Sequence, residues 1–511
     1  MAGTSSSVHR AARRWLMCGA LTLALPSLAH AATRTVGPGK TYAKPCAAIA
    51  AAQDGDVIEI DAGTYAGDVC AIPRSRLTLR GVGGRAHLDA AGAAFGGKGT
   101  WVIQGDDTTV ENVEFSGAKV PDMNGAGIRQ EGHGLTVRNC YFHDNEDGIL
   151  TGGGGEILIE GSEFANNGAG DGYSHNMYIG HERKFTLRWS YSHHAKVGHV
   201  VKSRAEQNYI LYDRLMDEAD GTSSYTIDLP NGGTSFVIGN LIQQGPSTQN
   251  PAILAYAEEG ASNPGTDLYV VNNTFVNDRG SGTFLQLAAA AAPAVVRNNV
   301  FAGGGTITNQ AGALSAANFS SGDPLLVDRA AFDYHLRPGS PCVNAGVEPG
   351  VAGAMSLAPE LQYVHPAARE ARGANGTIDV GAYELGGGAP LSDGGAGVDG
   401  SADATETTGA SGTTGASGAA GTAGAAGASG ATGAAGTTGA AGAAGAGGPG
   451  EASSGGCSCR AVAPGAEASP AGVTLLVVMV MAAAGRRARV RARAKESFPR
   501  RRDRDTIVRS L

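Results

Sequence analysis

The residues from 171 to 204 concentrate the side chains of this sequence that could do acid–base chemistry. Five of the twelve histidines lie there, with six lysines and arginines and only two acidic residues. The histidines are His175, His181, His193, His194 and His199, and the lysines and arginines are Arg183, Lys184, Arg188, Lys196, Lys202 and Arg204. A cationic stretch of this kind favours an anionic ligand.

These residue types match the requirements for cleaving a uronate polymer by β-elimination. The reaction needs a base for the proton next to the carboxylate, a positive charge that neutralises this carboxylate, and an acid for the departing oxygen. We expect Lys202 to be the base, and Arg204 or Lys196 to neutralise the carboxylate. His199 or His194 would then be the acid or a second base.

A further set of residues is expected to bind the substrate around this group. It consists of His175, Asn176, Tyr178, His181, His193, Lys196, Asp228 and Asn231. Each has an ordinary alternative: Lys202 and Asp228 could form a plain surface salt bridge, and the paired histidines could be loop residues without function. The clustering, more than any single residue, favours the functional interpretation.

An internal repeat supplies the elements that must position these residues. Short apolar segments with alternating polarity recur through the middle of the chain, for example TVENVEF, TVRNCYF and VVRNNVF. A recurring position within them falls at Asn112, Asn139, Gly161, Trp189, Asp213, Asn240, Asn272 and Asn298. Alternating strands at a period of two to three dozen residues indicate the turns of a solenoid. We therefore predict an all-β fold, a right-handed parallel β-helix over residues 32–385, with stacked asparagines forming amide ladders.

The repeat also predicts which side chains face outward. The inward aliphatic column is expected to hold Leu150, Ile179, Val201, Ile227 and Leu254. Residues next to these must point to solvent, and the expected outward set is Tyr178, Val200, Lys202, Thr226 and Asp228. Lys202 and Asp228 would then be stacked neighbours, about 4.8 Å apart.

Both flanks of the repeat resemble one superfamily. The segment 47–69, which contains AAIAAAQDGDVIEIDAGTY, resembles the first coil of pectate-lyase-like β-helices with its short capping helix. The segments Asp323–Gly346 and Ile378–Glu384 resemble the closing part of the same proteins. The resemblance implies a β-helix from about 33 to 385, and leaves the reaction open because one fold hosts many activities.

A shorter resemblance concerns the reaction. The stretch His199-Val-Val-Lys202-Ser203-Arg204, followed by Asn208, resembles the lysine-serine strand of β-helix alginate lyases and chondroitinase B. It implies that Lys202 is the base, that an arginine assists, and that calcium held by Glu and Asn neutralises the uronate. The acidic residue which that family places shortly before the lysine is absent here, so we expect basic side chains to replace calcium. Calcium is the one cofactor that the resemblance suggests, and the sequence assigns no metal ligand.

The two ends of the chain indicate export. Residues 1–31 combine basic residues, an apolar stretch and the cleavage site Ala29-His30-Ala31, as a secretory signal does. Residues 386–456 are almost wholly Gly, Ala, Ser and Thr, and are expected to be a flexible, disordered linker. Residues 457–511, with a Cys-Ser-Cys motif, a short apolar segment and a basic tail, resemble the sorting signals of myxobacterial surface proteins. We expect an exported protein, at the cell surface or outer membrane or outside the cell, whose C-terminal segment contacts the membrane or sorting machinery.

The net charge limits the kind of ligand that the protein can bind, and the expected export determines how its cysteines are interpreted. The whole chain carries −8, and without the basic tail (+8) and the N-terminal arginines (+3) the body carries −19. So acidic a body argues against nucleic-acid binding. An exported protein can hold disulfides, and Cys46 and Cys70 are expected to form one across the N-terminal cap. Cys140 is expected to be a buried free thiol.

The predicted function is cleavage of an acidic polysaccharide by a lyase. One alternative is a glycoside hydrolase or uronate epimerase on the same fold, with acids among Asp213, Asp217, Glu218, Asp220, Asp228, Glu258 and Glu259. The other is a surface adhesin or glycan-binding protein without catalysis. The sequence specifies neither the glycan nor the oligomeric state.

Overall fold

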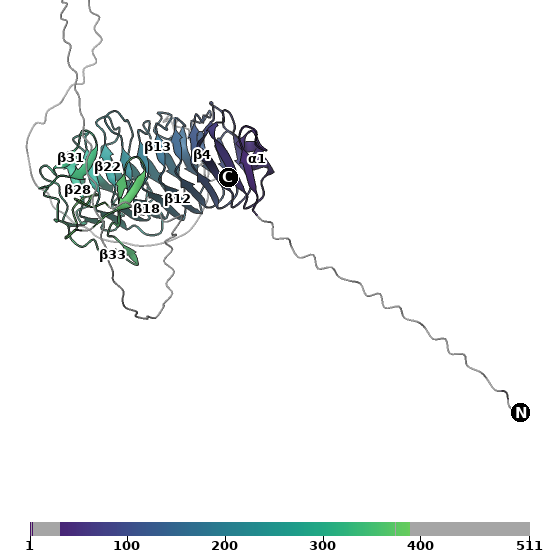
Figure 1. Cartoon of the computed structure of the whole chain (residues 1–511). Coiled ribbons are helices and arrows are strands. Elements are labelled where there is room, and N and C mark those ends of the chain that lie inside the picture. Colours follow the sequence, from purple (N-terminus) through teal and green to yellow (C-terminus); the bar gives the residue numbers. More distant parts are fainter. Residues whose placement is uncertain (2, 4–30, 374, 389–511) are drawn as a thin grey trace, which may run out of the picture. The chain divides into compact units, whose positions relative to one another are not determined.

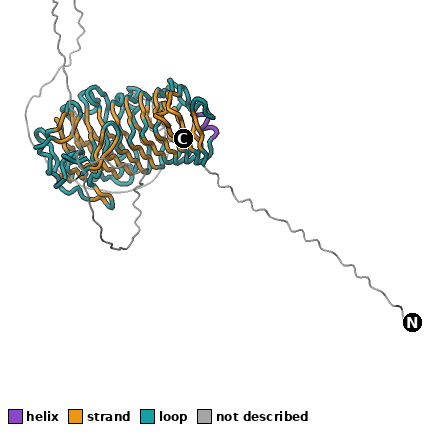
Figure 2. Tube along the Cα trace, viewed as in Figure 1, coloured by secondary structure: helices purple, strands orange, loops and turns teal. Residues whose placement is uncertain are grey.

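The computed structural model of the chain describes residues 1, 3, 31–373 and 375–388. Most of the expected signal and linker, and all of the expected sorting segment, lie outside the described residues. From residue 31 on, the described chain winds into a solenoid of parallel strands, seen as stacked strands joined by short loops in Figure 2. The strands that carry the candidate site lie in the middle of this solenoid.

One strand from each turn belongs to a ten-stranded parallel sheet. Its strands are β3 (Cys70–Ile72), β5 (Gly99–Ile103), β8 (Ala126–Gln130), β11 (Asp147–Thr151), β14 (Met177–Ile179), β17 (Val201–Ser203), β20 (Ile227–Leu229), β23 (Ala252–Tyr256), β26 (Thr283–Leu287) and β29 (Thr306–Thr308). The side of this sheet that faces away from the interior of the solenoid is called its outer face below.

The other strands of each turn form two rows of a twenty-stranded sheet (Figure 1). The first row holds β1 (Thr33–Val36), β2 (Val57–Thr64), β4 (Thr78–Asp89), β6 (Thr108–Glu111), β9 (Leu135–Arg138), β12 (Glu156–Glu160), β15 (Lys184–Arg188), β18 (Gln207–Leu211), β21 (Thr234–Ile238), β24 (Leu268–Val271), β27 (Val295–Arg297) and β30 (Leu314–Ala316). The second row holds β7 (Val113–Ser116), β10 (Tyr141–His143), β13 (Glu163–Ala165), β16 (Tyr191–His193), β19 (Arg214–Met216), β22 (Leu241–Gln244), β25 (Thr274–Asn277) and β28 (Val300–Gly303). The long strand β4 pairs with both rows. The predicted right-handed parallel β-solenoid is confirmed.

The interior of the solenoid is built from alternating apolar side chains that stack on successive turns. Phe115, Phe142 and Phe164 occupy equivalent positions of β7, β10 and β13, and neighbouring rings lie 4.9 and 4.8 Å apart and nearly parallel. This spacing equals the distance between hydrogen-bonded strands. The regular repeat of Phe in the sequence is therefore a consequence of the stacking.

The recurring turn lies between the two rows of the twenty-stranded sheet, and its first residue has a left-handed backbone. The φ angles lie between 39° and 70° at Asn112, Asn139, Gly161, Trp189, Tyr212, Gly239, Asn272 and Asn298. Asn and Gly tolerate this conformation best, which explains why they dominate this position. Trp189 and Tyr212 are the exceptions.

The amide ladder is formed by the residue that follows the left-handed one. Asn240, Asn273, Asn299 and Asn318 are linked in order by amide hydrogen bonds of 2.9, 3.0 and 2.9 Å. The predicted series therefore mixed two positions. Six of its members are left-handed turn residues, whereas Asp213 and Asn240 are ladder residues one step further along the chain.

The register of the ten-stranded sheet was predicted in part. The inward column contains Val201, Ile227 and Leu254 as expected, but Ile149 and Met177 take the places predicted for Leu150 and Ile179. Leu150 instead packs on Tyr178 at the outer face. In the outward set, Tyr178, Lys202 and Asp228 are paired on adjacent strands as predicted.

Two members of the predicted outward set are not part of the outward column that Tyr178, Lys202 and Asp228 form. Val200 is wholly buried in the hydrophobic core, so its outward placement was wrong. Thr226 is also buried. Both residues directly precede a strand of only three residues, where the bend of the chain overrides the alternation.

A short helix and a disulfide close the N-terminal end. Helix α1 (Pro45–Ala51) contacts β1, β2 and β3, and Cys46 in α1 is disulfide-bonded to Cys70 in β3. Cys140 is a buried free thiol whose pKa is raised to about 12 by burial. Among the described residues α1 is the one α-helix, and none of them forms a helix long and apolar enough to cross a membrane.

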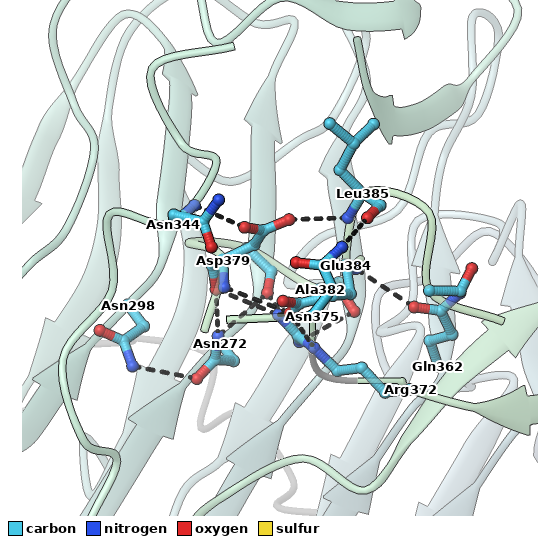
Figure 3. A network of polar contacts seen from close by, with 12 residues as sticks. Asn272, Asn298, Asn344, Gln362, Arg372, Asn375, Asp379, Ala382, Glu384 and Leu385 are labelled. Carbon is cyan, nitrogen blue, oxygen red and sulfur yellow. Dashed lines mark hydrogen bonds and ion pairs between the residues drawn. The ribbon is translucent and has the colours of Figure 1, made fainter. Parts of the chain in front are cut away.

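The closing segment at the C-terminal end is held by a buried polar network (Figure 3). The guanidinium of Arg372 pairs with the Glu384 carboxylate at 3.1 Å and donates hydrogen bonds to the Asp379, Gly381 and Ala382 carbonyls. The Asn272 side chain donates to the carbonyl oxygens of Asp379 and Gly381. The closing segment is thereby attached to a turn of the solenoid about a hundred residues earlier.

Three antiparallel hairpins complete the closing segment. They are β31 (Leu326–Asp328) with β32 (Asp333–Leu336), β33 (Val351–Ala352) with β34 (Met355–Ser356), and β35 (Leu361–Val364) with β36 (Ala368–Ala371). The last hairpin reaches the two aromatic turn residues. The Arg369 guanidinium lies 3.8 Å from the centroid of the Trp189 ring, and the Glu360 amide donates to the Tyr212 hydroxyl. The exceptional aromatic residues of the turn therefore serve as its docking points.

Candidate functional site

The candidate site is built on the outer face of the ten-stranded sheet. Tyr178 in β14, Lys202 in β17 and Asp228 in β20 are paired side by side on three successive turns. Each follows or precedes an inward aliphatic residue, so strand alternation turns all three side chains outward. His175, His199, Arg204 and Asn231 lie at the ends of the same strands. We call these seven residues the cationic cluster.

Arg204 is the centre of the hydrogen bonding in the cationic cluster. Its Nε donates to the Tyr178 hydroxyl at 2.8 Å, one terminal nitrogen donates to Asn231 Oδ1, and the other lies 2.7 Å from Glu259 Oε2. The Arg204 side chain is 5% exposed, whereas that of Glu259, in the loop after β23, is 49% exposed. A half-exposed loop carboxylate is thus held by a buried guanidinium.

Lys202 faces the same carboxylate. Its Nζ lies 4.0 Å from Glu259 Oε1 and 4.9 Å from the centroid of the Tyr178 ring. Within the described part of the chain, Nζ of Lys202 has no closer ionic partner. The carboxylate of Glu259 therefore lies between Lys202 and Arg204, and both of these cations lie near the ring of Tyr178.

His199 is neutral and its tautomer is set by its neighbours. Burial, with the charges of Lys202 and Arg204, lowers the pKa of His199 well below its usual value. Nδ1 of His199 accepts a hydrogen bond from the Tyr225 amide, so the ring proton is on Nε2, which lies 3.3 Å from Asp228 Oδ2. The His199 ring thus donates to Asp228 and has no lone pair left for a substrate proton.

His175 supports His199 from the turn below. The rings of His175 and His199 are stacked with centroids 4.5 Å apart, and the His199 amide donates to His175 Nδ1. His175 is itself wholly buried. Its role in this geometry is to position His199, and direct contact with a substrate, as expected from the sequence, does not fit its burial.

Five of the predicted residues lie outside the cationic cluster. Asn176 is wholly buried in a second amide ladder with Asn145 and Asn167, so a substrate-binding role does not fit it. His181 is exposed in the turn after β14. The others belong to the second row of the twenty-stranded sheet and the loop that follows it.

These other three have partners of their own. His193 in β16 pairs with Glu163, its Nδ1 lies 2.6 Å from Nδ1 of His194, and His194 pairs with exposed Asp220. Lys196 pairs with Asp144 at 3.1 Å. The sequence placed these side chains with Lys202 because they are near it along the chain, but the chain changes sheets between β16 and β17.

Sequence reasoning missed Arg129, which continues the outward column. It lies in β8, pairs with Leu150, and is 4% exposed. Its Nε has no hydrogen-bond partner among the described residues, and burial lowers the pKa of Arg129. The signal was present in the sequence: Arg129 follows inward Ile128 as Lys202 follows inward Val201.

The acids named for a hydrolase have mostly structural positions. Asp213 is a wholly buried ladder residue, and Asp217 accepts hydrogen bonds from Ser223 and Thr248. Glu218 pairs with Tyr191 and Arg214 on the other sheet. Of the acids considered, Asp228 and Glu259 are the two that touch the cationic cluster.

The cationic cluster does not fit a calcium ion. Calcium takes six to eight oxygen ligands, several of them from carboxylates. The carboxylate of Asp228 is engaged by His199, and that of Glu259 by Arg204 and Lys202. No step is therefore derived through calcium. Among the residues that the structure describes, the one compact group of metal-ligating side chains is on the twenty-stranded sheet.

Comparisons with known proteins agree on the architecture. A family model described as a right-handed beta helix region matches residues 91–208. The solved structure of the pectate lyase Pel9A is similar with a TM-score of 0.51 and 15% identity, over 69% of this chain and 96% of that one. A search of curated protein sequences finds no match.

Two other solved structures are more distantly similar. A pectin methylesterase variant in complex with a hexasaccharide has a TM-score of 0.33 and 15% identity, over 42% of this chain and 80% of its own. The Dettilon tailspike protein has a TM-score of 0.31 and 12% identity, over 51% of this chain and 63% of its own. At 15% identity, the similarity to Pel9A describes the fold alone.

Proposed function

We propose that this protein binds an acidic polysaccharide on the outer face of its ten-stranded sheet and cleaves it by β-elimination. The observation that carries the proposal is the Glu259 carboxylate between Lys202 and Arg204. A buried cationic pair that holds a half-exposed loop carboxylate is suited to exchange it for the carboxylate of a uronate, since this exchange leaves both buried cations paired.

The residues of the cationic cluster can supply each part of the reaction. With the uronate carboxylate paired to Arg204, the Lys202 amine takes the proton next to that carboxylate, and the electron pair of the broken C–H bond forms the new carbon–carbon double bond. The bond to the glycosidic oxygen breaks, and Tyr178 protonates this oxygen. The resulting phenolate is stabilised by the Arg204 Nε that already donates to it.

This assignment differs from the roles expected from the sequence at four residues. His199, with Nε2–H directed to Asp228 and Nδ1 accepting from Tyr225, positions Asp228 beside Lys202 and is not the acid. Tyr178 takes the acid role because its hydroxyl is on the same column as Lys202 and contacts Arg204. His194 and Lys196 have no part in it.

Two further points support a polymeric substrate outside the cell. The outward column extends from Lys202 past Tyr178 and Leu150 to Arg129, which can bind another negative charge along the same polymer. The chain also shares its fold with a pectate lyase. We propose in addition that the protein is exported and remains at the cell surface or is released, as its two ends predict.

Incubation of the full chain with alginate, pectate and glycosaminoglycans tests the proposal. We expect ultraviolet absorbance from unsaturated uronate products with one of them. Lys202→Ala should abolish this absorbance, whereas the matched control Lys196→Ala, which removes a lysine paired with Asp144, should retain it.

Other outcomes distinguish the alternatives. New reducing ends without the absorbance would indicate a hydrolase, and retention of a glycan without cleavage would indicate an adhesin. An active Lys202→Ala variant would remove Lys202 from the mechanism.

A further inference from the structure

A second group of chemically active side chains lies on the twenty-stranded sheet, away from the cationic cluster. His87 in β4, Glu114 in β7 and His143 in β10 come from three successive turns and point to the solvent side of the second row. His143 Nε2 lies 3.0 Å from Glu114 Oε1, and His87 Nε2 lies 3.6 Å from the same oxygen. The three ligand atoms all lie within 4.8 Å of one another.

We propose that His87, Glu114 and His143 bind a divalent transition metal ion of the zinc class. Zinc binds imidazole nitrogen and carboxylate oxygen at about 2.0–2.2 Å in a tetrahedron, whose ligand atoms are then about 3.4 Å apart. The two distances to Glu114 lie on either side of this value. Two imidazoles with one carboxylate are also a common zinc ligand set that leaves one position open.

The surroundings of His143 are those of a metal ligand. Its second nitrogen, Nδ1, lies 3.0 Å from Asp144 Oδ2, and the other Asp144 oxygen pairs with Lys196. Metal-bound histidines commonly donate their second N–H to a carboxylate in this way. To bind a metal, Nε2 of His143 would give up its hydrogen bond to Glu114 Oε1, and the proton that remains on Nδ1 would be donated to Asp144.

The second row also contains a natural comparison two turns further on. His193 stands in register with Ala165 and His143. Its Nε2 lies 3.3 Å from Glu163 Oε1, and Nε2 of His143 lies in the same way 3.0 Å from Glu114 Oε1. There, however, the second imidazole, His194, contacts Nδ1 of His193 and not the Glu163 side. The pair of His193 and Glu163 thus has the same hydrogen bond without a converging third ligand.

A metal at this position would connect three turns next to the capped N-terminal end. The side chains are 19% to 25% exposed, so an ion can enter from solvent and the fourth position is open to water or another small ligand. The site is independent of the cationic cluster, and its presence or absence says nothing about cleavage of a polysaccharide.

Equilibrium dialysis of the full chain against zinc chloride tests the site. The protein should be made without a histidine tag and with Cys457→Ser and Cys459→Ser, since thiolates bind zinc strongly. We expect one zinc per chain and a higher unfolding temperature with zinc present. Cobalt should give the visible absorption of a tetrahedral ion.

Single substitutions locate the ion. His87→Ala and His143→Ala should weaken binding at least 100-fold, and Asp144→Asn about 10- to 100-fold by loss of orientation. The matched control His193→Ala should bind like the parent. Circular dichroism of each variant without metal shows whether the fold is kept, and Glu114→Gln provides a third ligand variant of nearly the same shape.

Three results would overturn the proposal. They are the absence of stoichiometric zinc binding by the parent chain, unchanged binding in folded His87→Ala, and loss of binding in folded His193→Ala.

Discussion

Glu259 occupies the place that a substrate carboxylate would take, and this makes it the most informative residue of the candidate site. Its carboxylate competes with substrate for Arg204 and Lys202 without taking part in the chemistry. We expect Glu259→Gln to lower KM for the polysaccharide about 2- to 5-fold, in keeping with the small free energy of an exposed ion pair. Initial rates of unsaturated product formation measure this.

Glu258 offers the matched control for that substitution. It is the exposed neighbour of Glu259 and makes one long hydrogen bond with Gln286. Glu258→Gln should leave KM near that of the parent. An equal effect of both variants would show that general charge on the loop, and not the position of Glu259, determines substrate affinity.

At the residue scale, we expect that replacing Asp213 stabilises the protein. It holds a ladder position that Asn occupies on the next three turns, and its Oδ2 is buried without a hydrogen-bond partner among the described residues. Burial raises the pKa of Asp213 well above 3.8. The folded protein therefore retains a proton that the unfolded chain has lost, and stability falls as the pH rises above about 4.

Asp213→Asn should remove this dependence. An amide can complete the ladder, so we expect the free energy of unfolding at pH 7 to rise by about 1–3 kcal/mol, the cost of an unsatisfied buried group. Urea unfolding at pH 4 and pH 7 measures it. The reverse change, Asn240→Asp, should destabilise more at pH 7 than at pH 4, and a gain in that variant would contradict the argument.

At the scale of elements, alternation predicted which side chains face inward better than it predicted which of them stack. Val201, Ile227 and Leu254, with the neighbouring pair Lys202 and Asp228, followed directly from it. Leu150 faces outward against the prediction, and Ile179 faces inward as predicted but is in register with Ser203 and not with Val201, because alternation alone does not determine the register between strands. Because Leu150 was predicted to face inward, the outward column lacked the residue that lies between Tyr178 and Arg129.

The remaining errors in the site have a different physical cause. His193 and His194 are nine and eight residues from Lys202 along the chain, yet they lie at another sheet, because β16 ends at His193 and β17 begins only at Val201. Glu259 reaches Arg204 across a loop whose path no periodic pattern describes. The sequence predicted the repeat and part of its register, whereas contacts made by loops required the structure.

Replacing Arg372 tests how much its buried polar network stabilises the closing segment. Its side chain and that of Glu384 are 2% and 1% exposed, so removing one partner leaves a buried charge without its counter-charge. We expect Arg372→Ala to lower the free energy of unfolding by about 3–5 kcal/mol. Urea unfolding compares it with Arg337→Ala, an exposed arginine that bonds to the Val327 carbonyl and should cost far less. Equal losses would show that the network contributes little.

At the scale of the whole molecule, the length of the outward column predicts how activity depends on substrate size. Arg129 is three strands from Lys202, about 14 Å away, and in the proposed function it would bind a part of the polymer well beyond the cleaved bond. Arg129→Ala should raise KM for long chains and leave that for the shortest cleavable oligomer unchanged. Rates measured over a series of oligomer lengths check this, and a uniform effect at all lengths would contradict it.

The docking of hairpin β35–β36 on Trp189 and Tyr212 has a consequence for biosynthesis. Each coil can be added to the one before it as soon as it leaves the ribosome, because its partners are some two dozen residues upstream. The contacts on Trp189 and Tyr212 come from residues 360–369, which are synthesised about 150 to 180 residues later. In a nascent chain, Trp189 and Tyr212 therefore lack these contacts until nearly all of the coils have been synthesised. A factor that protects the nascent chain would have to act during this period.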